Sequence, residues 1–310
     1  LAWIAAADVL LHPSAVEAAP TVVREARALG VRVVACEAGD IAAWALDDAG
    51  IAVIEVGTNH PGEVETLRYD RIIACTGLRF DASSFSDRLR PELTPCGRLP
   101  KMTHEWESTS VSDLFFAGTL MQYRDYKKCM SSFVHGFRYN VRALTHMLRG
   151  RYHGEAWPTT HVDPSVSSIR YAILARVNRS SGIWLQPGFL ADFIHVDPSA
   201  AVATYYSEVP FDYAREVLTT RGSWISMSLE YGPDHSFDPF FHERVHRSDV
   251  AHATSSAFLH PVVRYFVGGE PVAEHHIIED LAGVWEEAEH IEPLESFLRQ
   301  CLLGKTCAAE

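Results

Sequence analysis

Hydrophobic and polar positions along the first 80 residues predict helices and strands in turn. The Ala-rich stretch 17–29 is typical of a helix, and Gly30 would end it. Strands are expected at four short apolar runs, residues 31–36, 51–56, 64–69 and 71–75. The second and third runs are close enough to pair as a hairpin. This order predicts an α/β layer that carries an inserted antiparallel hairpin.

Beyond residue 80 the chain is rich in turn residues until a short apolar run at 114–117, which is expected to be a buried strand ending at Gly118. A long helix is then predicted from about Cys129 to Leu148, with Gly150 ending it. Its apolar face is expected to consist of side chains at helical spacing, namely Phe133, Phe137, Val141, Leu144 and Leu148.

Three polar side chains on this predicted helix allow more than one role. We expect His135 to be a hydrogen-bonded core histidine rather than a catalytic base. Arg138 and Arg142 form either a solvated edge or an edge that faces phosphate, and the sequence does not choose between these alternatives.

The prolines between residues 154 and 164 predict a domain boundary. The first domain would span residues 1–153 and be α/β, and the second would span 160–310 and be α+β. Within the second, the pattern predicts helices at 169–177, 210–218 and 274–303, a mixed segment at 184–194, and a strand at 224–231. The last helix is acidic, and an exposed face of it would carry His275, His276 and Glu279.

Composition narrows the classes of function. The 310 residues carry 27 Lys and Arg against 40 Asp and Glu, a net charge of −13, which disfavours non-specific binding to nucleic acid or anionic membranes. No apolar run approaches the roughly 20 residues that a membrane span needs. The six cysteines form no C-x-x-C pair and no zinc-ribbon spacing, and the composition points to a reducing, cytoplasmic setting.

Two segments, 69–77 and 113–119, share a pattern that suits ligand binding. In each, a hydrophobic strand ends on a small residue and a glycine, so that the backbone can approach a ligand closely. A separation of about 40 residues can bring two strand ends to one cleft of an open sheet. The helix after the second segment would direct the positive end of its dipole towards the ligand, which suits the negative edge of a reduced flavin.

These two segments resemble the C-terminal flavin-domain signatures of two-dinucleotide flavoproteins, the group that contains flavin-containing monooxygenases. Residues 125–128 and 133–139 are similar to the FAD-dependent oxidoreductase domain-containing proteins, and 229–232 and 258–262 agree with them. The resemblance implies a Rossmann-like core in the first domain. It also implies monooxygenase-like chemistry, in which NADPH reduces FAD and electrons pass to oxygen or another acceptor.

The same resemblance assigns the residues that contact the flavin. Ala117, Gly118 and Thr119 would contact it from the second segment, and Thr76 and Gly77 from the first. The turn before the long helix would be lined by Asp125, Tyr126 and Lys128. The residue pattern indicates no catalytic acid or base.

The chain departs from the family pattern in two ways. It has no G-x-G-x-x-G, since no two of its glycines stand two positions apart. Thr119 stands where many relatives carry Asp. We therefore expect the FAD-fingerprint half to lie outside this chain, as its N-terminal partner within the same protein. The alternative is a vestigial flavoprotein that acts as a protein-binding module.

A competing motif is His242-Glu243-x-x-His246, which on a helix would place two imidazoles on one face for zinc. His252 follows at nearly the spacing of a third ligand. Asp249, however, occupies the position where zinc proteases of this type need glycine, and no methionine follows downstream. We therefore expect a polar surface segment and no metal site, with a zinc metalloprotease as the remaining alternative.

Overall fold

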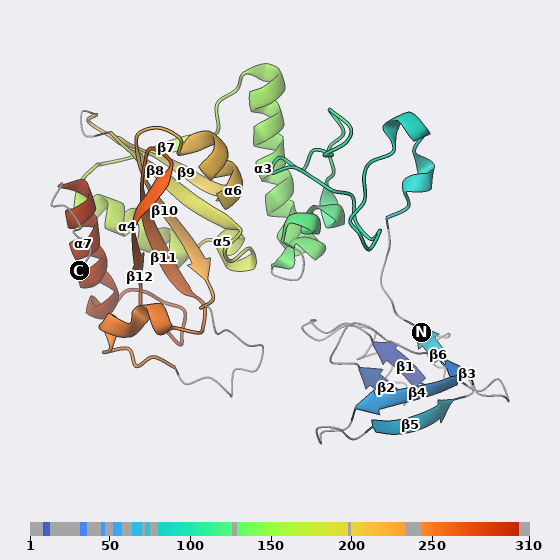
Figure 1. Cartoon of the computed structure of the whole chain (residues 1–310). Helices are drawn as coiled ribbons and strands as arrows, with labels where there is room; N and C mark the ends of the chain where they lie inside the picture. The colour runs from blue at the N-terminus through green and yellow to red at the C-terminus, as the bar shows by residue number, and fades with distance from the viewer. Residues whose placement is uncertain are drawn as a thin grey trace. The chain divides into compact units, whose positions relative to one another are not determined.

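The computed structural model describes residues 80–125, 129–197, 200–232 and 244–303, together with six short strands in the first 79 residues. Contacts divide the chain into two compact units, residues 1–79 and 80–310, and each is treated by itself (Figure 1). Among the described residues, no helix is both long enough and apolar enough to cross a membrane.

The first unit contains two small sheets. Its strands are β1 (Val9–His12), β2 (Arg32–Ala35), β3 (Ala45–Leu46), β4 (Ala52–Gly57), β5 (Val64–Tyr69) and β6 (Ile72–Ala74). Strand β1 pairs in parallel with both β2 and β6, whereas β3, β4 and β5 form an antiparallel sheet. The hairpin predicted for 51–56 and 64–69 is confirmed. The helix expected over 17–29 lies outside the described residues, and a Rossmann-like core stays a prediction.

The second unit is built around a six-stranded antiparallel sheet in the order β12-β11-β10-β8-β9-β7. Its strands are β7 (Thr159–Val162), β8 (Leu190–Val196), β9 (Ala203–Pro210), β10 (Ser223–Glu230), β11 (His260–Val267) and β12 (Glu270–His276). The inner strands β8 and β10 are buried over almost their whole length, whereas the edge strands β7 and β12 are largely exposed. Because both faces of the sheet are covered, even the polar residues Ser226 and Ser228 of β10 are buried.

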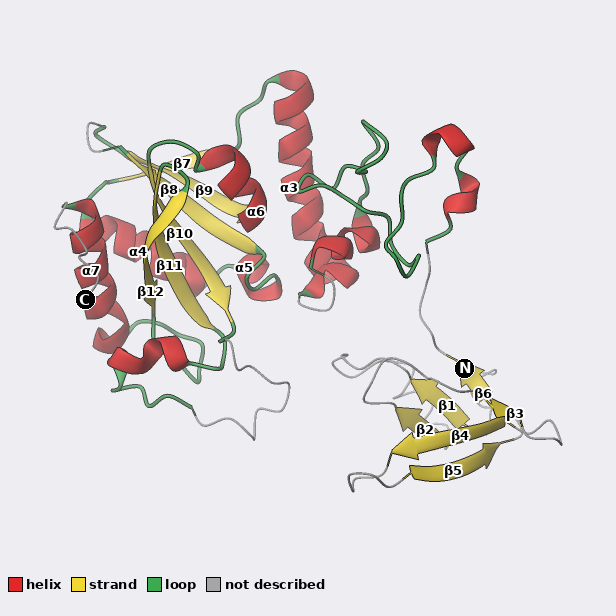
Figure 2. Cartoon of the chain, in the orientation of Figure 1, coloured by secondary structure: helices red, strands yellow, loops and turns green. Residues whose placement is uncertain are grey.

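Helices cover both faces of this sheet (Figure 2). One face packs against α4 (Val166–Val177) and α7 (Ala288–Leu302), which bury Ile173 and Leu294 against Ile225 of β10. The other face packs against α6 (Phe211–Tyr213) and the π-helical turn η5 (Ala214–Leu218), with Phe193 of β8 in the core. Successive strand residues therefore point to opposite layers.

A third core lies beside the sheet and belongs to residues 80–153. It contains α3 (Val134–His153) and buries Trp106 and Met121 completely, packed with Phe189 ahead of β8. The shorter helices of the unit are η1 (Ala82–Ser84), η2 (Asp87–Leu89), η3 (Gly118–Arg124), η4 (Met130–Ser132), α5 (Ser181–Leu185) and η6 (Val250–Ser255). This packing joins the segment with the predicted flavin residues to the sheet of the second unit.

The boundaries and the buried face of α3 differ from the prediction. The helix starts at Val134, passes through Gly150 and ends at Gly154, whose φ of 67° is the left-handed conformation that glycine favours. A glycine within a helix costs only about 1 kcal/mol, which the packing of α3 outweighs. Phe133 precedes the helix and is 44% exposed. Of the other predicted residues, Leu144 is buried, and Val141 and Leu148 are partly buried against the same core. The fully buried face also contains residues that were not predicted, namely Gly136, Tyr139, Asn140, Ala143 and Met147.

Other expectations also require correction. The run 114–117 is not a strand, because only an isolated bridge joins Phe115 to Glu107. The helix expected over 274–303 is β12, then a loop, then α7. His275 and His276 therefore lie on an edge strand, and Glu279 is buried after it. The two-residue turn Gly268-Gly269 pairs this segment with β11 as a hairpin, and that pairing overrides the helical pattern here.

Residues 154–164, expected to separate two domains, contribute β7, which pairs with β9. The division into domains 1–153 and 160–310 stays a prediction. The helix expected at 169–177 is confirmed as α4, and the strand at 224–231 is confirmed as β10. The mixed segment 184–194 contains the end of α5 and most of β8.

Candidate functional site

The segment predicted to contact flavin opens its backbone to solvent at Gly118. Ala117 is extended and exposed, and Gly118, at a φ of 74°, begins η3. A Cβ atom placed on Gly118 would have no other atom within 4 Å, so a ligand could lie directly against this backbone. Thr119 is exposed beside it. These three residues therefore fit a cofactor that approaches the main chain.

The other predicted flavin contacts are only partly described. Thr76, Gly77, Tyr126 and Lys128 lie outside the described residues. Asp125 is described at the end of η3, where its side chain is almost completely buried, with an exposed fraction of 3%. The structure thus places these residues on one short helix, η3. Ala117, Gly118 and Thr119 lie at its start, and Asp125 lies at its end.

The carboxyl group of Asp125 is buried with few polar partners to offset its lost hydration. Neither of its oxygens accepts a hydrogen bond of normal geometry from a described residue. Burial raises the pKa of Asp125 to about 6, although the nearby Ser131 and the charge of Arg124 favour the ionised form. A buried carboxyl group whose pKa is raised is typical of functional sites.

A buried polar cluster lies next to Asp125, between η4, α3 and the end of α5. The Asn140 amide donates to the Ser131 hydroxyl at 2.7 Å, and that hydroxyl also lies 3.0 Å from Nε2 and 3.1 Å from Oε1 of Gln186. All three side chains are fully buried. Oδ1 of Asn140 has no partner among the described residues, so polar capacity remains free in this interior.

Arg124 fixes η3 to the rest of the unit. Its guanidinium lies 4.3 Å from the ring of Trp106 and 4.9 Å from that of Phe189, and it forms an ion pair with Asp212 of α6. The side chain is only 4% exposed. Cation–π contacts of the buried Arg124 and its ion pair with the half-exposed Asp212 together hold the helix that starts at Gly118 in one position.

His135 does not occupy the position expected from the sequence. Its imidazole is exposed and stacks on the ring of Phe133 at a centroid separation of 5.5 Å. The expectation of a core histidine is therefore wrong. The buried face of α3 is turned towards Tyr139 and Asn140, which leaves the first turn of the helix exposed at this position.

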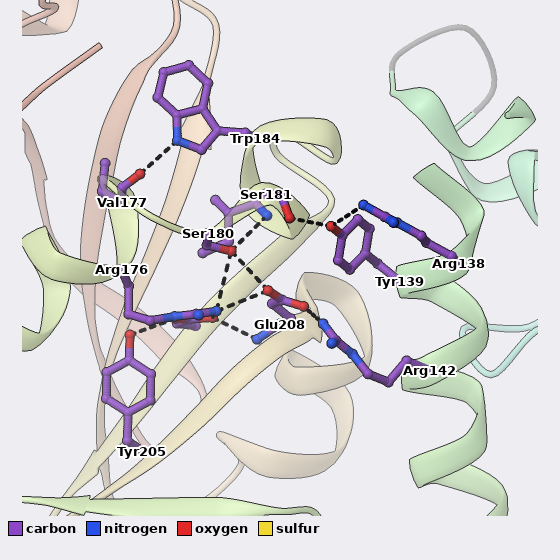
Figure 3. Close-up of polar contacts among 12 residues, drawn as sticks. Arg138, Tyr139, Arg142, Arg176, Val177, Ser180, Ser181, Trp184, Tyr205 and Glu208 are labelled. Atoms are coloured by element: carbon purple, nitrogen blue, oxygen red, sulfur yellow. Dashed lines mark hydrogen bonds and ion pairs between the residues drawn. The ribbon is translucent and has the colours of Figure 1, made fainter. Parts of the chain in front are cut away.

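A second site lies between α3 and the sheet (Figure 3). Four guanidinium groups surround a pocket of about 430 Å³, which is lined by Arg138, Tyr139, Arg142, Arg176, Arg179, Ser180, Ser181 and Glu208. The first three of these residues come from α3, and Glu208 comes from β9. The others lie on α4, on α5 and in the turn between them. Arg138 and Arg142 therefore line a defined cavity, as the phosphate-facing alternative for these residues requires.

Two carboxylates pair with the arginines of this pocket, and of these Glu208 belongs to its lining. Asp192 of β8 is 1% exposed and accepts hydrogen bonds from Arg176 Nε at 2.7 Å, Tyr205 at 2.6 Å and the backbone N–H of Glu208 at 2.7 Å. Burial raises the pKa of Asp192, and these donors oppose that effect. Glu208 accepts from Arg176 at 3.1 Å and Ser180 at 2.9 Å, and it forms an ion pair with Arg142.

The backbone is adapted to place Glu208 at the base of the pocket. Glu208 has a φ of 53°, in the left-handed region that few residues other than glycine adopt. A Cβ atom on Gly182 would lie 2.6 Å from Cδ of Glu208, so any other residue there would displace the Glu208 carboxylate from its present position. The strained backbone of Glu208 and the small size of Gly182 both serve to position this carboxylate.

Sequence reasoning missed Arg176, Asp192 and Glu208 as members of one site. A signal was present in two arginine pairs within an acidic chain, at positions 138 and 142 and at 176 and 179. The first pair shares one side of α3, whereas the second spans the end of α4 and the turn that follows it. That the two pairs face each other depends on the tertiary structure.

The candidate zinc motif His242-Glu243-x-x-His246 is not helical in the part that the structure describes. His242 and Glu243 lie outside the described residues, and residues 244–246 are not helical. His246 is exposed and hydrogen-bonds to Ser248 at 2.7 Å. Among the described residues, no group of three or more His, Cys, Asp or Glu side chains could hold a metal ion.

The fold and these sites define a mixed α/β protein with an exposed glycine turn and an arginine-lined pocket. The chain is 35% identical over 276 residues to a Danio rerio protein named FAD-dependent oxidoreductase domain-containing protein 2, covering 79% of this chain and 39% of the relative. It is 34% identical over 268 residues to the Mus musculus protein of the same name, covering 76% and 39%. The resemblance found in the sequence is therefore confirmed, and the chain is a homologue of the FAD-dependent oxidoreductase domain-containing proteins.

The chain spans about two fifths of the length of these curated relatives. Their names indicate a family of FAD-dependent oxidoreductases, with FAD as the implied cofactor. No family model matches the chain. No solved structure matches it.

Proposed function

We propose that this chain is part of a flavin-dependent oxidoreductase and that Ala117, Gly118 and Thr119 contact FAD. The observation that carries the proposal is the open backbone at Gly118, in a homologue of proteins named for FAD. Bound FAD would supply the capacity to accept and pass on electrons. The chain's own contribution is to position the cofactor through main-chain atoms and through a rigidly anchored η3.

Asp125 is proposed to act at the far end of the same short helix, with Tyr126 and Lys128 beside it in sequence. Its buried carboxyl group can hold a proton near neutral pH, because burial raises its pKa to about 6. Thr76 and Gly77 stay proposed flavin contacts on the strength of the family resemblance alone. The reductant is proposed to be NADPH and the acceptor oxygen or another oxidant, as in monooxygenases; these steps rest on the family resemblance alone.

The test is the flavin content of the longest natural form of the protein, purified without added cofactor and measured by its absorption spectrum. Gly118→Ala is expected to weaken flavin binding at least tenfold, a change that corresponds to about 1.4 kcal/mol. The added methyl group would occupy the space of the ligand and strain a φ of 74°. Bleaching of the flavin bands by NADPH under anaerobic conditions would support the proposed reductant.

Gly268→Ala is the matched control. Gly268 has a φ of 59° and also has no atom within 4 Å of an added Cβ, but it lies in the turn between β11 and β12. The two variants therefore carry a similar backbone strain, and only Gly118→Ala is expected to lose flavin. A colourless parent protein, or equal flavin content in both variants, would contradict the proposal.

A further inference from the structure

The pocket between α3 and the sheet collects positive charge in an acidic protein. Four arginines line it together with one carboxylate, Glu208, and a second carboxylate, Asp192, pairs with Arg176 outside the lining. The chain as a whole carries a net charge of −13. A local excess of cations against this background is a feature that binding of an anion would explain.

Two of the four arginines already have structural partners. Arg176 forms ion pairs with both Asp192 and Glu208, and Arg142 pairs with Glu208. By contrast, Arg138 and Arg179 form no ion pair with any carboxylate of the described residues. Both are exposed at the pocket. The two positive charges left after this pairing match the charge of a doubly ionised phosphate group.

Tyr139 holds two of the guanidinium groups in place. Arg138 lies 4.7 Å and Arg142 lies 5.2 Å from the centroid of its ring, and Nη2 of Arg138 donates to the Tyr139 hydroxyl at 2.8 Å. That hydroxyl is also bonded to Ser181 of α5. Arginines fixed against an aromatic ring lose less side-chain freedom when they bind a ligand.

We propose that this pocket binds the phosphate group of a small phosphate monoester through Arg138, Arg142 and Arg179. The planar guanidinium fork matches phosphate oxygens and can bind two of them at once. The volume of about 430 Å³ lies in the range of small-molecule sites and leaves room beyond the phosphate for a compact polar body. The site requires no flavin and goes beyond the proposed oxidoreductase function.

The test is isothermal titration calorimetry of the full 310-residue chain with inorganic phosphate and with ribose 5-phosphate at low ionic strength. Arg138→Gln and Arg179→Gln are each expected to weaken binding about tenfold or more, because each removes a charge-assisted contact. Both side chains are exposed, and thermal unfolding of the variants verifies that they fold. A stronger affinity for ribose 5-phosphate would identify an ester as the ligand, whereas equal affinities would identify the free ion.

Arg149→Gln is the matched control. Arg149 lies on the same helix, is 54% exposed and pairs with Glu155 away from the pocket. Its replacement removes the same charge and is expected to change the affinity less than twofold. The proposal is overturned if neither phosphate compound binds the parent chain at millimolar concentration. Equal weakening in all three variants would also overturn it, because that result would reflect net charge alone.

Discussion

Arg176→Met is expected to lower the free energy of unfolding of the second unit by about 3–5 kcal/mol. The guanidinium of Arg176 lies 2.7 Å from Asp192 and 3.1 Å from Glu208, and these two carboxylates are 1% and 9% exposed. Methionine fills a similar volume but leaves two buried negative charges close together, with only Arg142 opposing them. Urea unfolding followed by tryptophan fluorescence measures the loss.

Arg170→Met is the control for this prediction. Arg170 also lies on α4 and forms one ion pair, with Glu295 of α7 at 3.1 Å, but both of those side chains are about one-quarter exposed. Water stabilises the remaining charge, so the expected loss is below about 1 kcal/mol. An equal loss of unfolding free energy in the two variants would mean that Arg176 is not needed to compensate the buried charges of Asp192 and Glu208.

Asp125→Asn is expected to raise the free energy of unfolding of the flavin-free chain at pH 7 by about 3 kcal/mol, since one unit of pKa corresponds to about 1.4 kcal/mol. The folded chain holds the pKa of Asp125 at about 6, above the ordinary value of 3.8. Between these values the folded state binds the proton more strongly than the unfolded state. The contribution of Asp125 to stability is therefore fully present below pH 4 and is lost as the pH rises through 6.

The pH dependence distinguishes this effect from a simple change in packing. Asparagine resembles the protonated carboxyl group, so the gain is expected to vanish near pH 4 and to be complete above pH 6. Urea unfolding at several pH values measures it. Asp163→Asn is the control, because Asp163 is exposed, its pKa is lowered by hydrogen bonds with Ser165, and no gain at pH 7 is expected. A gain that does not depend on pH would contradict the prediction.

The outcome for Asp125 also bears on function. A buried carboxyl group that destabilises the folded state at neutral pH is typical of sites where a proton or a ligand is held. If Asp125→Asn stabilises the chain and also lowers its flavin content, the side chain has a role at the cofactor. If it stabilises the chain without affecting flavin, Asp125 is not part of the cofactor site.

Local pattern was sufficient for elements whose neighbours in sequence are also their neighbours in space. The hairpin of β4 and β5 follows from two apolar runs joined by a short turn. Helix α4 follows from its periodic apolar residues together with the capping residue Ser165. The family resemblance likewise rests on short contiguous motifs, so the sequence by itself was enough to indicate a homologue of FAD-dependent oxidoreductases.

Contacts between elements decided the remaining features. The acidic segment that contains His275 was expected to be helical, yet it pairs with β11 across the two-residue turn Gly268-Gly269 and forms β12. The main-chain hydrogen bonds of this hairpin outweigh the helical preference of the segment. The start of α3 depends on Gly136, whose missing Cβ would otherwise lie 1.9 Å from the carbonyl oxygen of Met130. The burial that raises the pKa of Asp125 comes from the packing of η3 and η4, which no local pattern reveals.

The arginine pocket shows the same division. The sequence determined that Arg138 and Arg142 share one side of a helix and left open whether that side faces water or phosphate. Only the tertiary structure decided that they face Arg176 and Glu208 at one cavity, since these residues are brought together by the packing of α3 against α5 and β9. Charge clusters assembled from separate elements have no local signature, because each element shows only its own share of the charge.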